Sequence, residues 1–232
     1  MEARAGTLGR RRAGATRVAA LLVAATTLGA GIGAGLHFLL ARPTSSAAII
    51  TAHYGLEGQQ SWPAGARPAP AINTLVDQTG HRFSLSSLRG RTIALVFFDS
   101  HCNQECPLEG RELSAAETSV PAADRPVLVA VSVNPLDTAA SARKAAQAWG
   151  LAAVAPWHWL MGTRAELARV WRSYHIYVGR AADGDIPHTE AVILIDARGY
   201  ERSGYLYPFG QRFVTHDESV LGAEAAAARK HG

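Results

Sequence analysis

The sequence predicts an α/β protein with a central mixed sheet flanked by helices. Three apolar, β-branched segments are each typical of a strand buried on both faces: residues 92–98, 127–133 and 191–196. Segments with the apolar spacing of helices lie between them, over residues 107–119, 141–149 and 163–174. Strands and helices that alternate along a chain in this way build a layered α/β domain.

The remaining segments complete the sheet and its connections. Residues 75–83 are predicted to form two strands around a turn at Gly80, and residues 191–207 two strands around a turn at 196–199. Pro107 suits the first turn of its helix, and Gly150 suits the end of another. Shorter elements are a helical turn over 84–90, a strand over 157–161 and a terminal helix in the alanine-rich tail from residue 219.

Residues 18–40 form an apolar stretch without Asp, Glu, Lys or Arg. Its 23 residues are enough to cross a bilayer, which takes roughly 20. The preceding flank is rich in arginine, and arginines kept in the cytoplasm would place most of the chain on the extracytoplasmic side. We therefore expect a single-pass protein of the cell membrane. The alternative is a cleaved signal peptide, although the stretch is longer than the usual signal core of roughly 7–15 residues.

The chain divides into five expected parts. They are a basic cytoplasmic segment over 1–17, a transmembrane anchor or uncleaved signal over 18–40, a flexible linker over 41–70, a folded α/β domain over 71–218 and a C-terminal tail over 219–232. Residues 1–42 hold six of the 23 basic residues and one of the 19 acidic ones, so the rest of the chain has a net charge of −1. The high isoelectric point therefore reflects membrane topology, and we expect no nucleic-acid binding.

The segment Cys102-Asn103-Gln104-Glu105-Cys106-Pro107 holds the only two cysteines of the chain. It follows the first buried strand and leads into a helix, which is the arrangement of a thioredoxin-like domain, and ligands of such sheets gather at the carboxyl ends of the strands. The spacing of Cys102 and Cys106 brings both sulfurs to one side of a helix or of the loop entering it. The positive end of that helix favours thiolate over thiol.

Thiolates attack disulfides and bind soft metals, so the pair is predicted to be either a redox pair or part of a metal site. The redox motif of thioredoxins separates its cysteines by two residues, whereas this chain has three between them. A purely stabilising disulfide ranks third, because closing so small a loop would lower the entropy of the unfolded chain only slightly.

His188 is the histidine that we expect beside the two sulfurs. It follows Pro187 just before the third buried strand, and in a thioredoxin-like sheet this turn faces the cysteine loop. A proline at this place is commonly preceded by a cis peptide bond. His101 touches the motif, but neighbours in an extended chain tend to point apart. The alternative for His188 is an ordinary loop histidine, and the other histidines are expected on the surface or in packing.

Taken together, the chain resembles the Sco family (SenC/PrrC), the membrane-anchored, thioredoxin-like copper proteins of cytochrome oxidase assembly. The match runs through about residues 71–214. It is carried by the C-x-x-x-C-P motif, by His188 downstream and by segments 75–80, 88–91, 96–98, 131–135, 160–163 and 193–199. The chain differs at Asn103-Gln104-Glu105, where Sco proteins usually have Pro and Asp, and at Pro187, where they usually have Asp.

The resemblance implies that Cys102, Cys106 and His188 bind copper. Two thiolates and an imidazole suit Cu(I), and they suit Cu(II) when a further donor joins. The implied function is that of a metallochaperone rather than an enzyme. It would deliver copper to the binuclear copper centre of the copper-bearing subunit of cytochrome c oxidase, or to another copper or thiol acceptor.

The alternative function is that of an extracytoplasmic thiol–disulfide reductase, an oxidoreductase that keeps the cysteines of an acceptor reduced. Cys102 would attack the acceptor's disulfide, and Cys106 would resolve the mixed disulfide. Peroxidase chemistry is a weaker third hypothesis. A peroxidatic cysteine typically needs an arginine and a threonine close by, and the spacer between the two cysteines supplies neither.

Overall fold

The structure is a computed structural model that describes residues 55–154, 156–180 and 185–231. The predicted basic segment and the predicted membrane anchor, residues 1–17 and 18–40, lie outside the described residues. Within the described part of the chain, no helix combines the length and the apolar character needed to cross a membrane.

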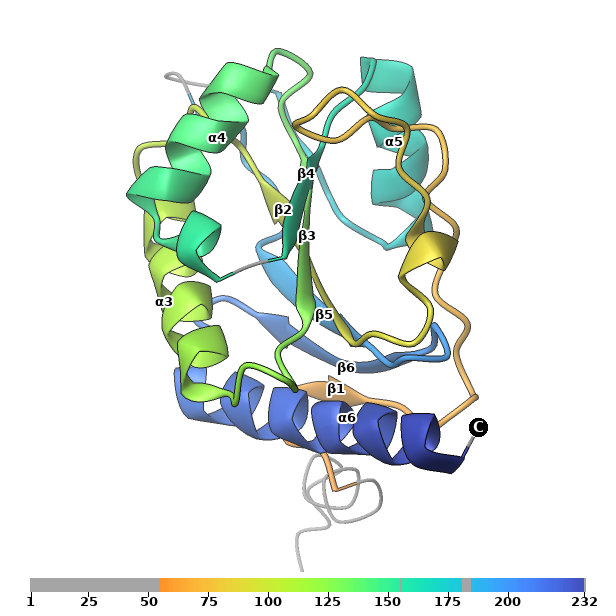
Figure 1. Ribbon diagram of the computed structural model, residues 1–232. Coiled ribbons are helices and arrows are strands. Elements are labelled where there is room, and N and C mark those ends of the chain that lie inside the picture. Colours follow the sequence, from red (N-terminus) through yellow and green to blue (C-terminus); the bar gives the residue numbers. More distant parts are fainter. Residues whose placement is uncertain (1–54, 155, 181–184, 232) are drawn as a thin grey trace, which may run out of the picture. The chain divides into compact units, whose positions relative to one another are not determined.

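The described residues form a six-stranded mixed sheet in the order β1-β6-β5-β2-β3-β4 (Figure 1). The parallel strands are β2 (Ile93–Phe98), β3 (Val127–Ser132) and β4 (Trp157–Leu160). The antiparallel pairings add β5 (Ala191–Ile195), β6 (Glu201–Leu206) and β1 (Gln60–Ser61). The three predicted buried strands are β2, β3 and β5, and every residue in them is buried, so these predictions are confirmed.

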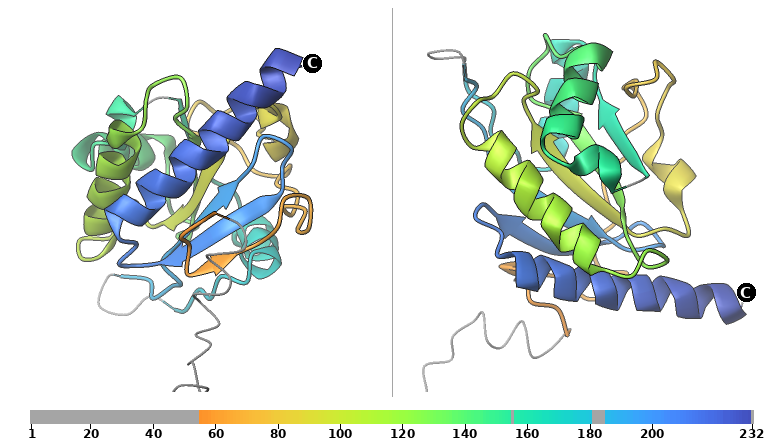
Figure 2. Two further views of the ribbon diagram at one scale, coloured as in Figure 1. Left: turned by 90° about the horizontal axis from the view of Figure 1, so that it is seen from below. Right: turned by 60° about the vertical axis from the view of Figure 1, so that its left-hand side comes forward.

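Helices cover both faces of the sheet (Figures 1 and 2). One face packs against α3 (Cys106–Ser119), α4 (Ala139–Ala148), the short 3-10 helix η2 (Leu151–Ala153) and α6 (Gln211–His231). The other packs against α5 (Arg164–Ser173) and the 3-10 helix η1 (Leu85–Leu88). Each face has its own apolar core, with Leu113 and Leu221 in the first and Leu167 and Trp171 in the second. This mixed sheet between helices fits the predicted thioredoxin-like fold.

The described part of the predicted flexible linker, residues 55–70, differs from the prediction. Leu56 is fully buried in the core, and β1 pairs with the edge strand β6. Asp217 of α6 accepts hydrogen bonds from the backbone N–H groups of Glu57 and Gly58, at 2.7 and 3.1 Å. The segment is therefore held to the domain by burial and by a buried carboxylate, although its composition resembles that of a linker.

Two further elements differ from their predicted form. Residues 75–83 make isolated bridges from Val76 to Arg82 and Met161 instead of two strands, because Asp77 accepts hydrogen bonds from Thr79 and tightens the turn. The predicted turn glycine, Gly80, does adopt a positive φ of 83°. The terminal helix begins earlier than predicted, at residue 211.

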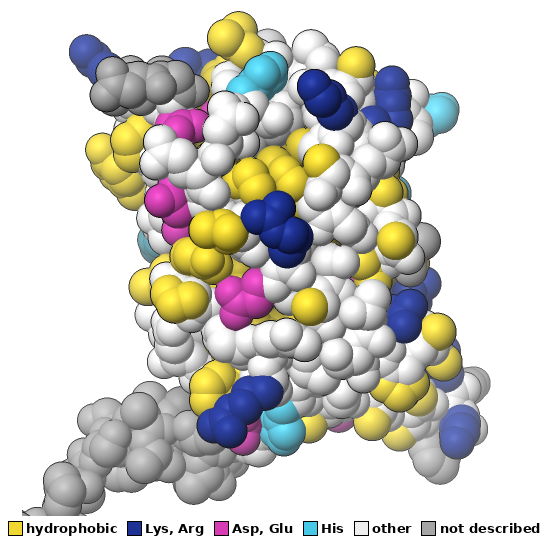
Figure 3. Space-filling model, turned by 90° about the vertical axis from the view of Figure 1, so that its left-hand side faces the viewer, with side chains coloured by type: hydrophobic (Ala, Val, Ile, Leu, Met, Phe, Trp, Pro, Cys, Tyr) yellow, Lys and Arg dark blue, Asp and Glu magenta, His cyan; other side chains and the backbone are white. Residues whose placement is uncertain are grey.

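Helices α3 and α4 approach each other closely at Gly110. A Cβ atom added there would lie 2.8 Å from the Cβ of Trp149 and 3.0 Å from its ring. The surface turned toward the viewer in Figure 3 carries basic, acidic and apolar side chains in an interspersed pattern. The close contact at Gly110 brings α3, which begins at Cys106, against the C-terminal end of α4.

We expect Gly110→Ala to lower the free energy of unfolding by about 1–3 kcal/mol, since the added methyl group forces Trp149 to move. The clash outweighs the helix propensity of alanine, which favours the variant by about 1 kcal/mol. Urea unfolding would measure the change, with the exposed Arg111→Ala as a control that stays within about 0.5 kcal/mol of the wild type. A Gly110→Ala protein as stable as the wild type would contradict the close contact.

Candidate metal and thiol site

The two cysteines follow the carboxyl end of β2, and Cys106 is the first residue of α3. Both thiols are free and buried, with exposed fractions of 8% for Cys102 and 0% for Cys106. The thiol of Cys106 donates a hydrogen bond to the sulfur of Cys102, which also accepts from the backbone N–H groups of Gln104 and Cys106. The two sulfurs therefore meet at the N-terminus of a helix, as their spacing predicts.

The two thiols have opposite acid–base properties. The hydrogen bond from Cys106 lowers the pKa of Cys102 to about 7, against the effects of burial and of the nearby Asp185. The same hydrogen bond and burial raise the pKa of Cys106 far above that of a free thiol. At neutral pH, Cys102 is thus the residue that carries the thiolate, while Cys106 keeps its proton.

This asymmetry predicts the pH dependence of alkylation in the reduced, metal-free protein. Cys102 should react with iodoacetamide with a midpoint near pH 7, whereas a free cysteine has a midpoint near pH 8.5. Peptide mass analysis after alkylation over a range of pH would locate the reacting residue. In a Cys106→Ala control, the midpoint of Cys102 should shift to higher pH because its hydrogen-bond donor is gone. An unshifted midpoint would contradict this cause.

A network of carboxylates holds the loop that leads into the cysteines. Asp137 accepts hydrogen bonds from the Oγ atoms of Ser100 and Ser132, at 2.6 and 2.7 Å. His101 places its Nδ1 3.1 Å from Asp137 and 3.6 Å from Asp99. The ring of His101 therefore contacts these two carboxylates, and the network fixes the backbone just before Cys102.

His188 lies beside the cysteine loop because β5 runs antiparallel to β2. Val96 pairs with Val192, so the residues that precede β5 lie next to those that follow β2. The Nδ1 and Nε2 atoms of His188 are 2.8 and 3.1 Å from the carbonyl oxygens of Ile186 and Phe97. A neutral imidazole has one N–H group and can donate to one of these carbonyls, which leaves the other nitrogen as a ligand.

The peptide bond before Pro187 is trans, so the expectation of a cis bond there was wrong. In the described residues the cis bond is Tyr207–Pro208. His188 pairs with Val178 as an antiparallel bridge, and the N–H of Gly179 donates to the carbonyl of Pro187 at 2.7 Å. This pairing requires extended backbone, which a trans bond provides.

The spacer between the cysteines connects their loop to the loop of His188. Gln104 Nε2 donates a hydrogen bond to Asp185 Oδ2 at 2.7 Å. This contact uses a spacer residue at which the chain differs from the usual Sco pattern.

Glu109 is a further member of the site, outside the ligand set predicted from the sequence. One potential ligand atom from each of Cys106, Glu109 and His188 lies within 4.8 Å of the other two. Cys102, a predicted ligand, is not in this group, and its sulfur lies next to that of Cys106. A signal was present in the sequence, because Glu109 follows Cys106 by three residues in the same helix and such residues share a face.

The side chain of Glu109 is buried next to the sulfurs. Its exposed fraction is 1%, and its Oε2 atom has no hydrogen-bond partner in the described residues. Burial raises the pKa of Glu109 to about 9, with smaller contributions from Glu190 and Cys102. The metal-free site therefore holds a neutral carboxylic acid at pH 7.

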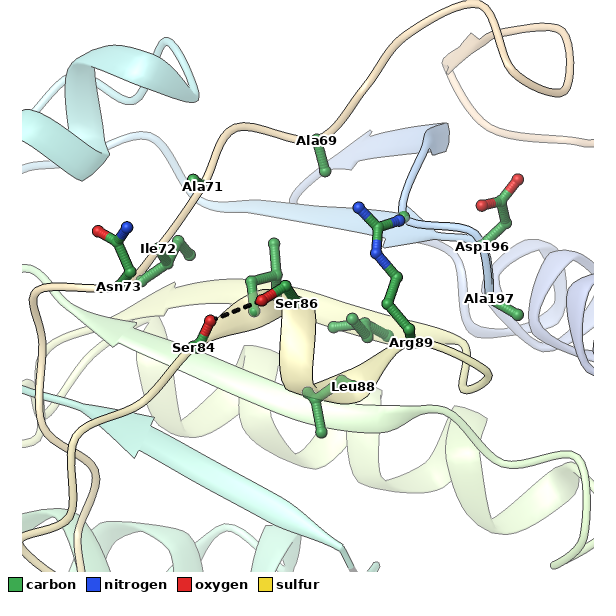
Figure 4. A pocket seen from close by; sticks show the side chains of 13 residues that line it. Ala69, Ala71, Ile72, Asn73, Ser84, Ser86, Leu88, Arg89, Asp196 and Ala197 are labelled. Atoms are coloured by element: carbon green, nitrogen blue, oxygen red, sulfur yellow. Dashed lines mark hydrogen bonds between the residues drawn. The ribbon is translucent and has the colours of Figure 1, made fainter.

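Two cavities lie away from this group. The first, about 120 Å³ in volume, is bounded by the start of β2 and the end of β5. It therefore lies at the other end of these strands from the cysteines. Figure 4 shows Arg89 beside this cavity, and Ser84 hydrogen-bonded to Ser86 at 2.8 Å. The second, about 240 Å³, lies over β5 and β6. Neither cavity is lined by a cysteine. The candidate site is the group of donor atoms at the cysteine loop.

Solved structures support the assignment of the fold. Bradyrhizobium japonicum ScoI, solved with copper bound, is 27% identical, and the match covers 72% of this chain and 99% of that chain with a TM-score of 0.52. Arabidopsis thaliana ScoI, also solved with copper bound, is 22% identical, with coverage of 70% and 98% and a TM-score of 0.57. BsSco, described as a member of the Sco family of cytochrome c oxidase assembly proteins, is 19% identical, with coverage of 71% and 98% and a TM-score of 0.56.

The family comparison covers most of the described chain. No curated protein matches this sequence. The SCO1/SenC family model matches residues 69–216, a range that includes both cysteines, His188 and all strands except β1. Because this match spans more than half of the chain, the resemblance drawn from the C-x-x-x-C-P motif is confirmed, and the protein belongs to the SCO1/SenC family.

Proposed function

We propose that this chain is a membrane-anchored metallochaperone that binds copper and delivers it to the binuclear copper centre of a respiratory cytochrome c oxidase. The observation that carries the proposal is that Cys106 lies beside His188 at the end of β2, with the free thiol of Cys102 next to that of Cys106, in a chain of the SCO1/SenC family. Two relatives of similar fold have been solved with copper bound, and BsSco is described as belonging to a family of oxidase assembly proteins.

The donor atoms at the site fit copper. Sulfur and imidazole ligands select Cu(I) over hard cations such as Mg²⁺ and Ca²⁺. Cys102, with a pKa of about 7, is partly thiolate at neutral pH, whereas Cys106 must lose its proton when the metal binds, so binding releases at least one proton. His188 must turn from one of its two backbone carbonyls to offer a nitrogen.

The rim of the site is acidic. Burial raises the pKa of Tyr207, and Glu105, Glu112 and Glu190 lie close enough to raise it further. Negative charge at the rim attracts a copper cation and favours a partner with a basic surface around its own copper site. Transfer would proceed by ligand exchange, in which an acceptor thiolate binds the copper as His188 leaves it. If this chain and its acceptor are anchored in the same membrane, the effective concentration of each for the other is higher.

A copper titration tests the proposal. The reduced full chain in detergent should bind one equivalent of Cu(I) in competition with a Cu(I) chelator, and Cys102→Ser or Cys106→Ser should abolish stoichiometric binding. His188→Ala should weaken binding by about 10- to 100-fold, the scale expected when a group at a metal site is removed. The exposed His81→Ala is the matched control. Wild-type protein without Cu(I) affinity would refute the function, and an unchanged His188→Ala affinity would exclude His188 as a ligand.

The cellular location is part of the proposal. The apolar stretch over 18–40 and the arginines before it support a single-pass anchor with the domain on the extracytoplasmic side. Alkaline phosphatase fused after residue 232 should be active, because this reporter matures outside the cytoplasm. The mass of the protein isolated from membranes would distinguish a retained anchor from a cleaved signal.

A thiol–disulfide reductase is the second candidate, and the opposite acid–base properties of the two thiols favour it. The Cys102 thiolate would attack a disulfide of the acceptor, and Cys106 would then displace the acceptor's second thiol. The acceptor disulfide becomes two thiols while Cys102 and Cys106 become a disulfide, with two electrons and two protons transferred. Reduction of a model disulfide at an undiminished rate by His188→Ala, together with weak Cu(I) affinity, would favour this function.

A further inference from the structure

We propose that Glu109 supplies the fourth ligand when this site holds Cu(II), and that Cu(I) is held without it by two sulfurs and His188. The inference rests on the proposed copper site and concerns its selectivity for the oxidation state of the metal. It assigns a role to a side chain outside the predicted ligand set of Cys102, Cys106 and His188.

The geometry places Glu109 within the coordination distance of the same metal. Its carboxylate, the sulfur of Cys106 and a ring nitrogen of His188 offer atoms that all lie within 4.8 Å of one another. Donor atoms bound to a single copper ion at about 2.0–2.3 Å are separated by less than this distance. Glu109 stands in the first turns of α3, where its backbone N–H donates to the carbonyl of Glu105 at 3.0 Å. The carboxylate is thus carried by the same helix that begins at the ligand Cys106.

The hydrogen bonds of Glu109 are incomplete without a metal. A polar side chain that is 1% exposed would ordinarily have partners for its oxygen atoms, yet Oε2 has none in the described residues. Glu117 and Glu218 are also buried and unpartnered, but they face each other between α3 and α6, away from the sulfurs and imidazole of the site. Of these three carboxylates, Glu109 is therefore the one positioned to complete a metal site.

The two oxidation states of copper prefer different ligands. Cu(I) is satisfied by two or three soft donors, so two thiolates and an imidazole suffice. Cu(II) favours four donors in a tetragonal arrangement and accepts oxygen ligands readily. The oxygen of Glu109 provides that fourth donor from a position closed to solvent, where it takes the place of a water molecule.

The test compares Glu109→Gln with Glu117→Gln in the full chain in detergent. Glu117 lies on the same helix and is equally buried and unpartnered, so Glu117→Gln controls for the loss of a buried carboxylate. Each protein is loaded separately with Cu(II) and with Cu(I). Electron paramagnetic resonance reports the Cu(II) ligands, chelator competition reports both affinities, and thermal melting confirms folding.

Glu109→Gln should change the g and hyperfine values of the Cu(II) form and weaken Cu(II) binding by at least about 10-fold, with Cu(I) affinity within about twofold of the wild type. Glu117→Gln should match the wild type in its Cu(II) spectrum, its Cu(II) affinity and its Cu(I) affinity. Unchanged Cu(II) spectrum and affinity in Glu109→Gln would overturn the inference while leaving the copper function intact. Equal losses of affinity for Cu(I) and for Cu(II) in Glu109→Gln would overturn the proposed selectivity. Wild-type protein that binds copper in neither state would refute the proposed function itself.

Discussion

Glu109→Gln is expected to raise the free energy of unfolding of the reduced, metal-free protein by about 3 kcal/mol at pH 7 and by about 6 kcal/mol near pH 9. Burial raises the pKa of Glu109 from its ordinary value of 4.5 to about 9 in the folded protein. Between these values the folded wild type holds one more proton than the unfolded chain, so its stability falls by about 1.4 kcal/mol per pH unit. Glutamine does not titrate, so the free energy of unfolding of the variant does not fall in this way.

Chemical unfolding of both proteins from pH 4 to pH 9 would measure the difference. Below about pH 4.5 the carboxyl group is protonated in both the folded and the unfolded states, so the two proteins should have similar stabilities. Buried acids that do not interact with Glu109, such as Glu117 and Glu218, contribute equally to both curves and cancel. The partly exposed Glu112→Gln on the same helix is the matched control. A gap that does not widen between pH 5 and pH 8 would contradict a neutral, buried Glu109.

Trp159→Ala is expected to lower the free energy of unfolding by about 3–5 kcal/mol. Trp159 is fully buried in β4, and its ring centroid lies 5.7 Å from those of Phe98 and Trp149. Its removal leaves a large cavity between β2 and α4, which the surrounding side chains can fill only in part. Denaturant unfolding followed by circular dichroism would measure the loss.

A second variant separates packing from hydrogen bonding at this position. The Nε1 atom of Trp159 donates to Ser132 Oγ at 2.9 Å, and that hydroxyl in turn donates to Asp137, which holds Ser100 in front of the cysteines. Trp159→Phe keeps most of the packing and should lose about 1–2 kcal/mol. Equal losses in both variants would mean that the hydrogen bond, rather than the volume of the ring, accounts for the stability contributed by Trp159.

The central strands and the thiol pair could be predicted because their signals are local. Runs of apolar, β-branched residues are typical of buried strands wherever they occur, and the spacing of Cys102 and Cys106 brings their sulfurs together at the start of a helix. His188 could be placed only through its position before a strand and through the resemblance to the Sco family. The structure supplies the reason, because antiparallel pairing of β5 with β2 brings the start of one strand to the end of the other.

Other features depend on contacts that no local pattern reveals. Leu56 lies in a segment with the composition of a linker, yet it is fully buried, because Asp217 of the distant α6 holds the neighbouring backbone. Glu109 occupies a helix in which a glutamate normally faces water. Only the packing of α3 against the sheet and the loop of His188 removes it from solvent.

The sequence by itself determined the α/β class and the membership of the family, because periodicity and motif spacing are properties of the chain alone. The ligand set of Cys102, Cys106 and His188 is a prediction from the motif and from the family resemblance. Tertiary structure decided which thiol ionises first and that a buried Glu109 stands beside Cys106 and His188. Both outcomes depend on burial and on hydrogen bonds. These arise when segments far apart in the sequence meet, and they shift the free energies of charged groups only in the folded protein.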